Sequence, residues 1–226
     1  PADLRAAHHP LLRRNELRQR SPPATCPHLL HRWRQHHTWR PSPKLHIAQH
    51  SSCAGLWRII RVLLYGLVAL NASPAPNLRF DLEQVALDLG TRSSEFALRW
   101  VESCGSTNTE LMNCTPEDDG RVHVLVAGQQ TAGRGRRGRV WLSWPDSCLT
   151  FSALWRFAPG APVPAGLSLV TGLAVAVALE KLGVEGLQLK WPNDVLIHGQ
   201  KLAGILVELL PGRGRTPAAV IGIGVN

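Results

Sequence analysis

The sequence has few cysteines, and they lack the arrangement of a metal site or a disulfide framework. Five cysteines occur in 226 residues, an odd number, and no two of them form a C-x-x-C pair. A structural zinc site usually has closely spaced pairs, and a disulfide-bonded secreted scaffold usually has an even number. The cysteine pattern therefore favours a protein of a reducing compartment.

Long apolar runs are also missing. The most apolar stretch near the N-terminus is LWRIIRVLLYGLVAL, residues 56–70, which has two arginines close to its start. The apolar part that follows them is shorter than the ~20 residues that a transmembrane helix needs. We therefore expect no membrane span. The stretch resembles the hydrophobic part of a signal peptide, and its arginine-rich surroundings are typical of a transit peptide.

Acidic residues are scarce in the first third of the chain. Residues 1–76 contain eleven Lys or Arg and two acids, so they carry the whole net charge of +9, and residues 77–226 contain fourteen of each sign. Eight of the ten histidines lie in residues 1–50, without metal-ligand spacing. We interpret residues 1–76 as a basic, disordered or atypical tail and residues 77–226 as a globular domain, joined by the linker-like NASPAPN.

From residue 78 onward the sequence predicts an orderly domain. Helices are expected over residues 80–90 and 165–183, the second apolar on nearly all sides and therefore buried. A capping box from Thr107 to Glu110 predicts a short third helix. Strands are expected over residues 96–103, 121–128, 140–144, 148–155, 187–191, 194–198, 201–209 and 218–226. This order predicts an α+β fold, a mixed and mainly antiparallel sheet with flanking helices.

A glycine- and arginine-rich loop, GRGRRGR, runs from Gly133 to Arg139 between two predicted strands. Its glycines match G-x-G-x-x-G, but a dinucleotide loop opens a helix and this one is followed by the strand-like VWLSW. The kinase motifs V-A-I-K, H-R-D and D-F-G are absent, as is the Walker G-K-[ST].

Glycine lets the backbone approach a ligand closely, and arginine donates to carboxylate or phosphate oxygens. The loop therefore predicts a small anionic ligand. A nucleic-acid-binding patch is the alternative, although the loop lacks interleaved aromatic residues.

Three further motifs carry chemistry of the same kind. KWPND places Lys190 for a phosphate and Asp194 for Mg²⁺, which binds one or two carboxylates together with substrate phosphates; an ordinary turn is the alternative. KLAGIL places Lys201 at the head of an apolar strand, where it binds a carboxylate or extends into solvent. IGIGVN predicts a strand pressed against another element or a ligand.

In this order and spacing, five motifs resemble the biotin protein ligases. They are STN (106–108), GQQTAGRGRRGRVW (128–141), GLSLVTGLAVAVALEKLG (166–183), LKWPNDVLIHGQKLAGILVEL (189–209) and VIGIGVN (220–226). The resemblance implies an enzyme that forms biotinyl-5′-AMP from biotin and MgATP. The biotin then passes to a lysine of a biotin carboxyl carrier domain, as in acetyl-CoA carboxylase. The implied fold is a catalytic domain akin to the class II aminoacyl-tRNA synthetases.

The resemblance also implies a role for individual residues. It makes Arg136 and Lys201 the catalytic residues and Asp194 the Mg²⁺ ligand. The implied biotin site is Ser106, Thr107, Asn108, Gln130, Gly133, Arg134, Gly135, Arg136, Lys201 and Gly204. The implied ATP site is Arg136, Arg139, Trp141, Lys190, Asn193 and Asn226.

Other expectations concern the chain as a whole. Members of the family commonly continue beyond the strand that matches GIGVN, so the resemblance implies a catalytic domain that is incomplete at its C-terminus. Residues 1–76 show no helix-turn-helix pattern, so DNA binding is not expected. A cytoplasmic location is expected, or an organellar one if residues 1–76 act as a transit segment, and a homodimer is compatible with the resemblance. The open alternatives are a lipoate or octanoyl transferase, an inactive truncated relative and a basic nucleic-acid-binding protein.

Overall fold

A computed structural model describes residues 60, 81–113, 116, 118–145, 147–159, 165–210 and 217–226. Its centre is a seven-stranded sheet in the order β1-β2-β3-β7-β6-β5-β4. Strands β1 and β2 are parallel, and every other neighbouring pair is antiparallel. The predicted α+β fold with a mixed, mainly antiparallel sheet is therefore confirmed. The strands are β1 (Phe96–Cys104), β2 (Val122–Gln130), β3 (Leu149–Arg156), β4 (Leu187–Lys190), β5 (Asp194–Ile197), β6 (Gln200–Leu210) and β7 (Ala218–Val225).

The helices have the bounds α3 (Leu82–Leu89), α4 (Thr107–Asn113) and α5 (Leu167–Lys181), with the 3₁₀ turns η1 (Gly90–Glu95) and η2 (Arg136–Gly138). Helix α3 forms where the sequence predicts it. The carboxylate of Asp81 accepts hydrogen bonds from the N–H groups of Glu83 and Gln84, which caps the first turn. Gly90, at a φ of 61°, ends the helix in a conformation that suits glycine.

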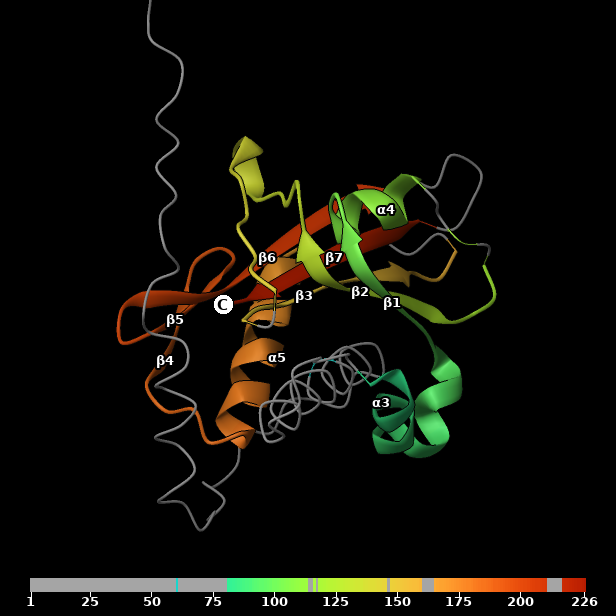
Figure 1. Ribbon diagram of the computed structural model, residues 1–226, viewed down its shortest axis with the longest axis horizontal. Coiled ribbons are helices and arrows are strands. Elements are labelled where there is room, and N and C mark those ends of the chain that lie inside the picture. Colours follow the sequence, from blue (N-terminus) through green and yellow to red (C-terminus); the bar gives the residue numbers. More distant parts are fainter. Residues whose placement is uncertain are drawn as a thin grey trace, which may run out of the picture.

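The sheet is covered on both faces. Figure 1 shows α5 and α3 on one face and α4 on the other. Val124 and Val126 of β2 belong to the larger core cluster, together with the buried side of α5. Leu125, between them, belongs to a smaller cluster with Leu111 of α4. This alternation is the period of two that a strand covered on both faces requires.

Helix α5 has an almost unbroken apolar sequence, and its middle and C-terminal turns are buried, from Thr171 to Leu179. Its first turn is more open, because Leu169 and Val170 are each 40% exposed. Within the described residues, no helix is long and apolar enough to cross a membrane. The predicted linker and most of the predicted tail lie outside the described residues; Ile60 is described, and its side chain is buried in the larger core cluster.

Two local predictions are wrong. Residues 140–144 form no strand: Val140 makes one isolated bridge to Arg134, and the residues after it have no regular structure. The segment does not pair into the sheet: Val140 and Leu142 are exposed, at 74% and 59%, while Trp141 turns into the pocket. The capping box also fails, since the Glu110 N–H donates to the Ser106 carbonyl and the Thr107 hydroxyl is used elsewhere.

Candidate active site

A pocket of about 500 Å³ opens between α4, the GRGRRGR loop and the strands β5, β6 and β7. All but two of the residues predicted to bind a ligand line it. They are Ser106, Thr107, Asn108, Gln130, Arg134, Gly135, Arg136, Arg139, Trp141, Lys190, Asn193, Asp194, Lys201 and Gly204. The exceptions are Gly133, a buried residue at the start of the loop, and Asn226, whose N–H donates to the Leu202 carbonyl.

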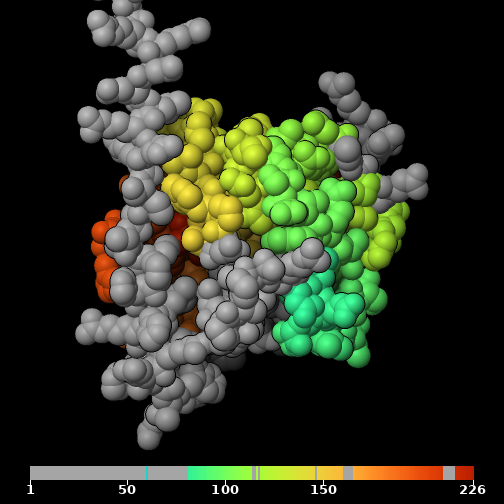
Figure 2. All heavy atoms as spheres, in the orientation of Figure 1, coloured from blue at the N-terminus to red at the C-terminus, as the bar shows by residue number. Residues whose placement is uncertain are grey.

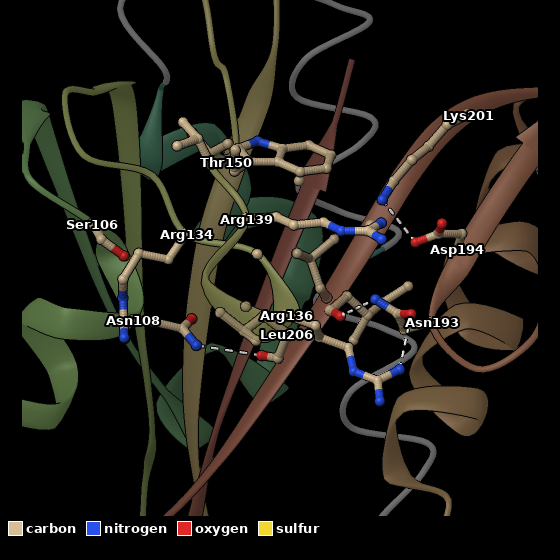
Figure 3. Close-up of a pocket in the computed structure, with 18 of the residues that line it drawn as sticks. Ser106, Asn108, Arg134, Arg136, Arg139, Thr150, Asn193, Asp194, Lys201 and Leu206 are labelled. Carbon is tan, nitrogen blue, oxygen red and sulfur yellow. Dashed lines mark hydrogen bonds and ion pairs between the residues drawn. The ribbon is translucent and has the colours of Figure 1, made fainter. Parts of the chain in front are cut away.

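The pocket has two ends, joined by the arginine-rich loop. Figure 3 shows Ser106, Asn108 and Arg134 at one end, and Asn193, Asp194 and Lys201 at the other. In Figure 1 the turn η2 of this loop is the yellow element that projects beyond the sheet. Figure 2 shows that the yellow residues following β2 reach the surface beside the green residues of α4.

Hydrogen bonds order the α4 end of the pocket. Ser152 Oγ lies 2.6 Å from Asn108 Oδ1 and 2.7 Å from Thr107 Oγ1. An amide oxygen can only accept, so the Ser152 hydroxyl donates to Asn108 Oδ1. Gln130 Oε1 accepts from the Thr107 N–H at 2.8 Å and lies 3.1 Å from the Thr107 hydroxyl. Thr107, Asn108, Gln130 and Ser152 thus form one hydrogen-bonded network.

The side chain of Asn108 is held from three sides. Its Nδ2 donates to Glu208 Oε2 at 2.9 Å and to the Leu206 carbonyl at 3.3 Å. Both partners are acceptors, so they fix which end of the amide carries the nitrogen. A Cβ atom at Gly222 would lie 2.2 Å from Asn108 Oδ1. The glycine at this position of β7 therefore leaves room for the Asn108 side chain.

The loop follows a defined path over the pocket. The Trp141 N–H donates to the Gly133 carbonyl at 2.9 Å, and the Gly135 N–H donates to the Arg139 carbonyl at 2.7 Å. Arg137 and Gly138 have φ values of 57° and 71°, which turn the chain back. A glycine suits this turn because a left-handed residue with a side chain is strained. The sequence therefore folds the loop back on itself and brings its arginines near the pocket mouth.

The arginines of the loop differ in what they contact. The Arg134 guanidinium donates to both carboxylate oxygens of Glu208, at 3.0 and 2.8 Å. The Arg136 Nη1 donates to Asn193 Oδ1 at 3.2 Å, across the pocket from the loop. The charge of Arg134 is thus neutralised by a neighbour, whereas Arg136 contacts a neutral amide and keeps its charge for a ligand.

The far end of the pocket is built from the β4–β5 turn and from β6. The N–H of Ile205 donates to the Asn193 carbonyl at 2.9 Å, and Asn193 Nδ2 donates to the Ile205 carbonyl at 3.0 Å. These two bonds fasten the turn to β6. Asp194 follows directly, and its Oδ1 lies 2.7 Å from the Nζ of Lys201. The pair leaves the second oxygen of Asp194 for another cation.

The Trp141 ring packs closely against two glycines. A Cβ atom at Gly224 would lie 2.3 Å from the indole ring, and one at Gly204 would lie 2.7 Å from it. The Nζ of Lys201 lies 5.3 Å from the ring centroid, within the range of a cation–π contact. The glycines of β6 and β7 therefore make room for the ring; for β7 the sequence predicted a strand pressed against another element or a ligand. The resemblance also implies that Trp141 stacks on adenine and that Gly204 leaves room for biotin, and these two roles stay predictions.

The pocket favours an anion. Its lining has six basic side chains (Arg134, Arg136, Arg137, Arg139, Lys190 and Lys201) and one carboxylate, Asp194. In the part of the chain that the structure describes, no three His, Cys, Asp or Glu side chains gather as metal ligands. The site therefore does not hold a metal cage, but it suits a metal that arrives with phosphates and takes one protein carboxylate.

Sequence reasoning missed two residues that order the pocket, namely Ser152 and Glu208. Each is a polar residue inside an otherwise apolar strand, and that is the signal that could have identified them. The two described cysteines, Cys104 and Cys148, form no disulfide with each other. Burial raises the pKa of the Cys104 thiol, and the nearby Glu110 carboxylate adds to the increase.

Comparison with known proteins places these residues in a sequence family. The model of the biotin/lipoate A/B protein ligase family matches residues 100–226. The bifunctional ligase/repressor BirA of Escherichia coli is 48% identical over 103 residues, which are 46% of this chain and 32% of BirA. The biotin–[acetyl-CoA-carboxylase] ligase of Paracoccus denitrificans is 42% identical over 123 residues, which are 54% of this chain and 50% of that protein.

Among solved structures, a biotin protein ligase from Aquifex aeolicus in complex with biotin and ATP aligns with a TM-score of 0.48 and 37% identity. The alignment covers 57% of this chain and 51% of that one. The chain thus spans between about a third and a half of the length of the curated relatives that it matches.

Proposed function

Because the chain belongs to the biotin/lipoate A/B protein ligase family, we propose that it carries the active site of a biotin protein ligase. The reaction has two steps: biotin is activated with MgATP to biotinyl-5′-AMP, and the biotin is then transferred to a lysine of a biotin carboxyl carrier domain. Two curated relatives, from Paracoccus denitrificans and Mycobacterium tuberculosis, are named as biotin–[acetyl-CoA-carboxylase] ligases. A cytoplasmic location is part of this proposal.

The observation that carries the proposal is the division of the pocket into two chemically different ends. The α4 end offers neutral hydroxyl and amide groups in a fixed network, around Thr107, Asn108 and Gln130. The other end offers Lys190, Lys201 and Asp194, which suit phosphates. A reaction between an acid that carries an uncharged ring system and a nucleoside triphosphate needs such a pair of sites side by side.

In the first step a carboxylate oxygen of biotin attacks the α-phosphorus of ATP, and the bond to pyrophosphate breaks. Both reactants are anions, so the site must neutralise charge between them. Lys201, beside Asp194 at one end of the pocket, serves the carboxylate of biotin, and the loop arginines Arg136 and Arg139 serve the phosphates. Catalysis here consists mainly of positioning and electrostatic stabilisation.

The residues present fit a single Mg²⁺ that binds together with the nucleotide. Asp194 would hold it through the oxygen that does not face Lys201. When bound, the ion neutralises charge on the phosphates and so favours attack. Asn193 fixes the turn that carries Asp194, which keeps the carboxylate in reach of the pocket.

In the second step the neutral amine of the acceptor lysine attacks the carbonyl carbon of the acyl-adenylate. The new C–N bond forms, AMP leaves with the electrons of the C–O bond, and the amine loses a proton. The loop that carries Arg136 lies over the pocket and would keep the adenylate from water until the acceptor arrives.

A single-turnover assay tests the proposal. The full chain is mixed with ATP labelled in the α-phosphate, Mg²⁺ and either biotin or lipoate, and the acyl-adenylate is separated from ATP. We expect a labelled adenylate with biotin and at least tenfold less with lipoate. Adenylate from lipoate alone would point to the lipoate branch of the family. No adenylate from either acid would contradict the proposal.

A further inference from the structure

Glu208 lies on β6, just outside the residues that line the pocket, and it contacts two of them. Its carboxylate accepts two hydrogen bonds from the Arg134 guanidinium and one from Asn108 Nδ2. Arg134 belongs to the loop and Asn108 to α4, and the two are otherwise separated by sequence and by strand β2. One side chain therefore connects the two elements that form one end of the pocket.

Glu208 holds its two partners by different contacts. Arg134 and Glu208 form an ion pair whose side chains are 45% and 22% exposed. A single guanidinium nitrogen, Nη2, donates to both carboxylate oxygens of Glu208. Asn108 is 3% exposed, and its amide is held by Glu208, Leu206 and Ser152. Both N–H groups of the Asn108 amide are therefore taken, and the Arg134 guanidinium is turned toward Glu208 by its Nη2.

We propose that Glu208 is a positioning residue that fastens the GRGRRGR loop to α4 through Arg134 and Asn108. In this arrangement Arg134 and Asn108 act as anchors, although both line the pocket. The anchor sets the distance between the hydroxyl and amide groups of α4 and the loop arginines that face the phosphates. The inference rests on the proposed function for its kinetic consequence, but the contact between loop and helix is independent of it.

A double-mutant cycle measures the kinetic consequence. Glu208→Gln and Arg134→Gln are prepared in the full chain, singly and together, and biotin KM and kcat are measured for adenylate formation. Each single variant should raise the KM for biotin about tenfold, the size expected for losing a hydrogen bond to a charged group, and change kcat much less. The double variant should resemble either single one, because both remove the same contact.

Glu95→Gln is the matched control. Glu95 forms a forked ion pair with Arg92 at the surface of η1, outside the pocket lining. The same chemical change there should leave the KM for biotin unaltered. Effects of Glu208→Gln and Arg134→Gln that multiply in the double variant would overturn the proposal, as would an effect no larger than that of Glu95→Gln.

Limited trypsin digestion supplies a second measurement that needs no activity. The loop contains four arginines, and the rate of first cleavage after each is followed by mass spectrometry. The rate at which a protease cleaves a folded protein depends on the fraction of molecules in which the cleaved segment is locally unfolded. We expect Glu208→Gln to speed cleavage in the loop about tenfold over the wild type, and Glu95→Gln to leave it unchanged.

The two measurements separate the two claims. A wild type that makes no adenylate contradicts the proposed function, while faster loop cleavage in Glu208→Gln still supports the anchor. A wild type that makes adenylate, with loop cleavage equal in all variants and an unchanged KM, overturns the anchor and leaves the proposed function standing.

Discussion

Lys201 and Asp194 form an ion pair across neighbouring strands, with the ammonium nitrogen 2.7 Å from one carboxylate oxygen. The same lysine nitrogen lies 5.3 Å from the centre of the Trp141 ring. Lys201 therefore stands between the carboxylate proposed for Mg²⁺ and the ring proposed for adenine. Its alternatives from sequence were to bind a carboxylate or to extend into solvent, and the structure places it in the pocket wall.

Lys201→Gln should slow adenylate formation by about 10²- to 10³-fold, because one charged donor to the reacting groups is lost. The thermal unfolding midpoint should change little, since the side chain is 44% exposed. Single-turnover formation of biotinyl-5′-AMP measures the loss. Lys181→Gln, at the exposed C-terminal end of α5, is the control and should keep the wild-type rate. Equal rates in the two variants would show that Lys201 has no part in the chemistry.

Gly224→Ala should weaken ATP binding by displacing Trp141, because the added methyl carbon would lie 2.3 Å from the ring. We expect a destabilisation of about 1–3 kcal/mol from overpacking. Trp141→Leu in the same protein should recover much of that stability, and this non-additivity is the signature of a direct contact. Calorimetry of ATP binding and thermal unfolding test both points.

Gly105→Ala provides the comparison for Gly224→Ala. Nothing lies within 4 Å of a Cβ atom at Gly105, so the same change should cost far less stability. If both alanine variants unfold at the same midpoint, the ring does not press on Gly224 in solution.

Ser152→Ala should destabilise the fold by about 1–3 kcal/mol, because Asn108 Oδ1 then loses its donor in a buried position. It should also raise the KM for biotin, since Thr107 and Asn108 lose their common partner. Ser94→Ala removes a hydroxyl at an exposed position and should change neither quantity. A stability for Ser152→Ala equal to that of Ser94→Ala would contradict the hydrogen-bond network.

Arg136→Gly should leave the fold intact and let the adenylate escape, because the contact from the loop to Asn193 is lost. The escaping acyl-adenylate reacts with lysines on unrelated proteins. The measurement is release of adenylate after a single turnover, with biotin on a bystander protein as the second readout. Arg121→Gly, at an exposed position outside the pocket lining, should release no more than the wild type.

Sequence reasoning located most of the pocket because its residues lie in local motifs. The KWPND turn and the GRGRRGR loop carry their chemistry in consecutive residues, and each stays together in the fold. It also identified β7 as a strand pressed against other groups, which proved to be Asn108 at Gly222 and Trp141 at Gly224. The predicted strand over residues 140–144 failed because Trp141 takes its place in the pocket instead of in a sheet.

The partners of Glu208 could not be predicted from the sequence. Arg134 lies 74 residues before Glu208, and Asn108 lies 100 residues before it. The sheet order, in which β3 and β7 lie between β2 and β6, and the packing of α4 on β3 and β7 bring the three together. A single glutamate in an apolar strand indicates that a cation or a hydrogen-bond donor must compensate its charge, but the sequence does not identify that group.

The most direct test of the central claim is the mass of an acceptor protein. A biotin carboxyl carrier domain is incubated with the full chain, MgATP and an equal mixture of biotin and lipoate, and the intact mass is measured. The account predicts an increase by one biotinyl group on the carrier lysine that requires ATP and is lost in Lys201→Gln. A lipoyl group on the carrier, or biotin that appears equally without ATP, would contradict it.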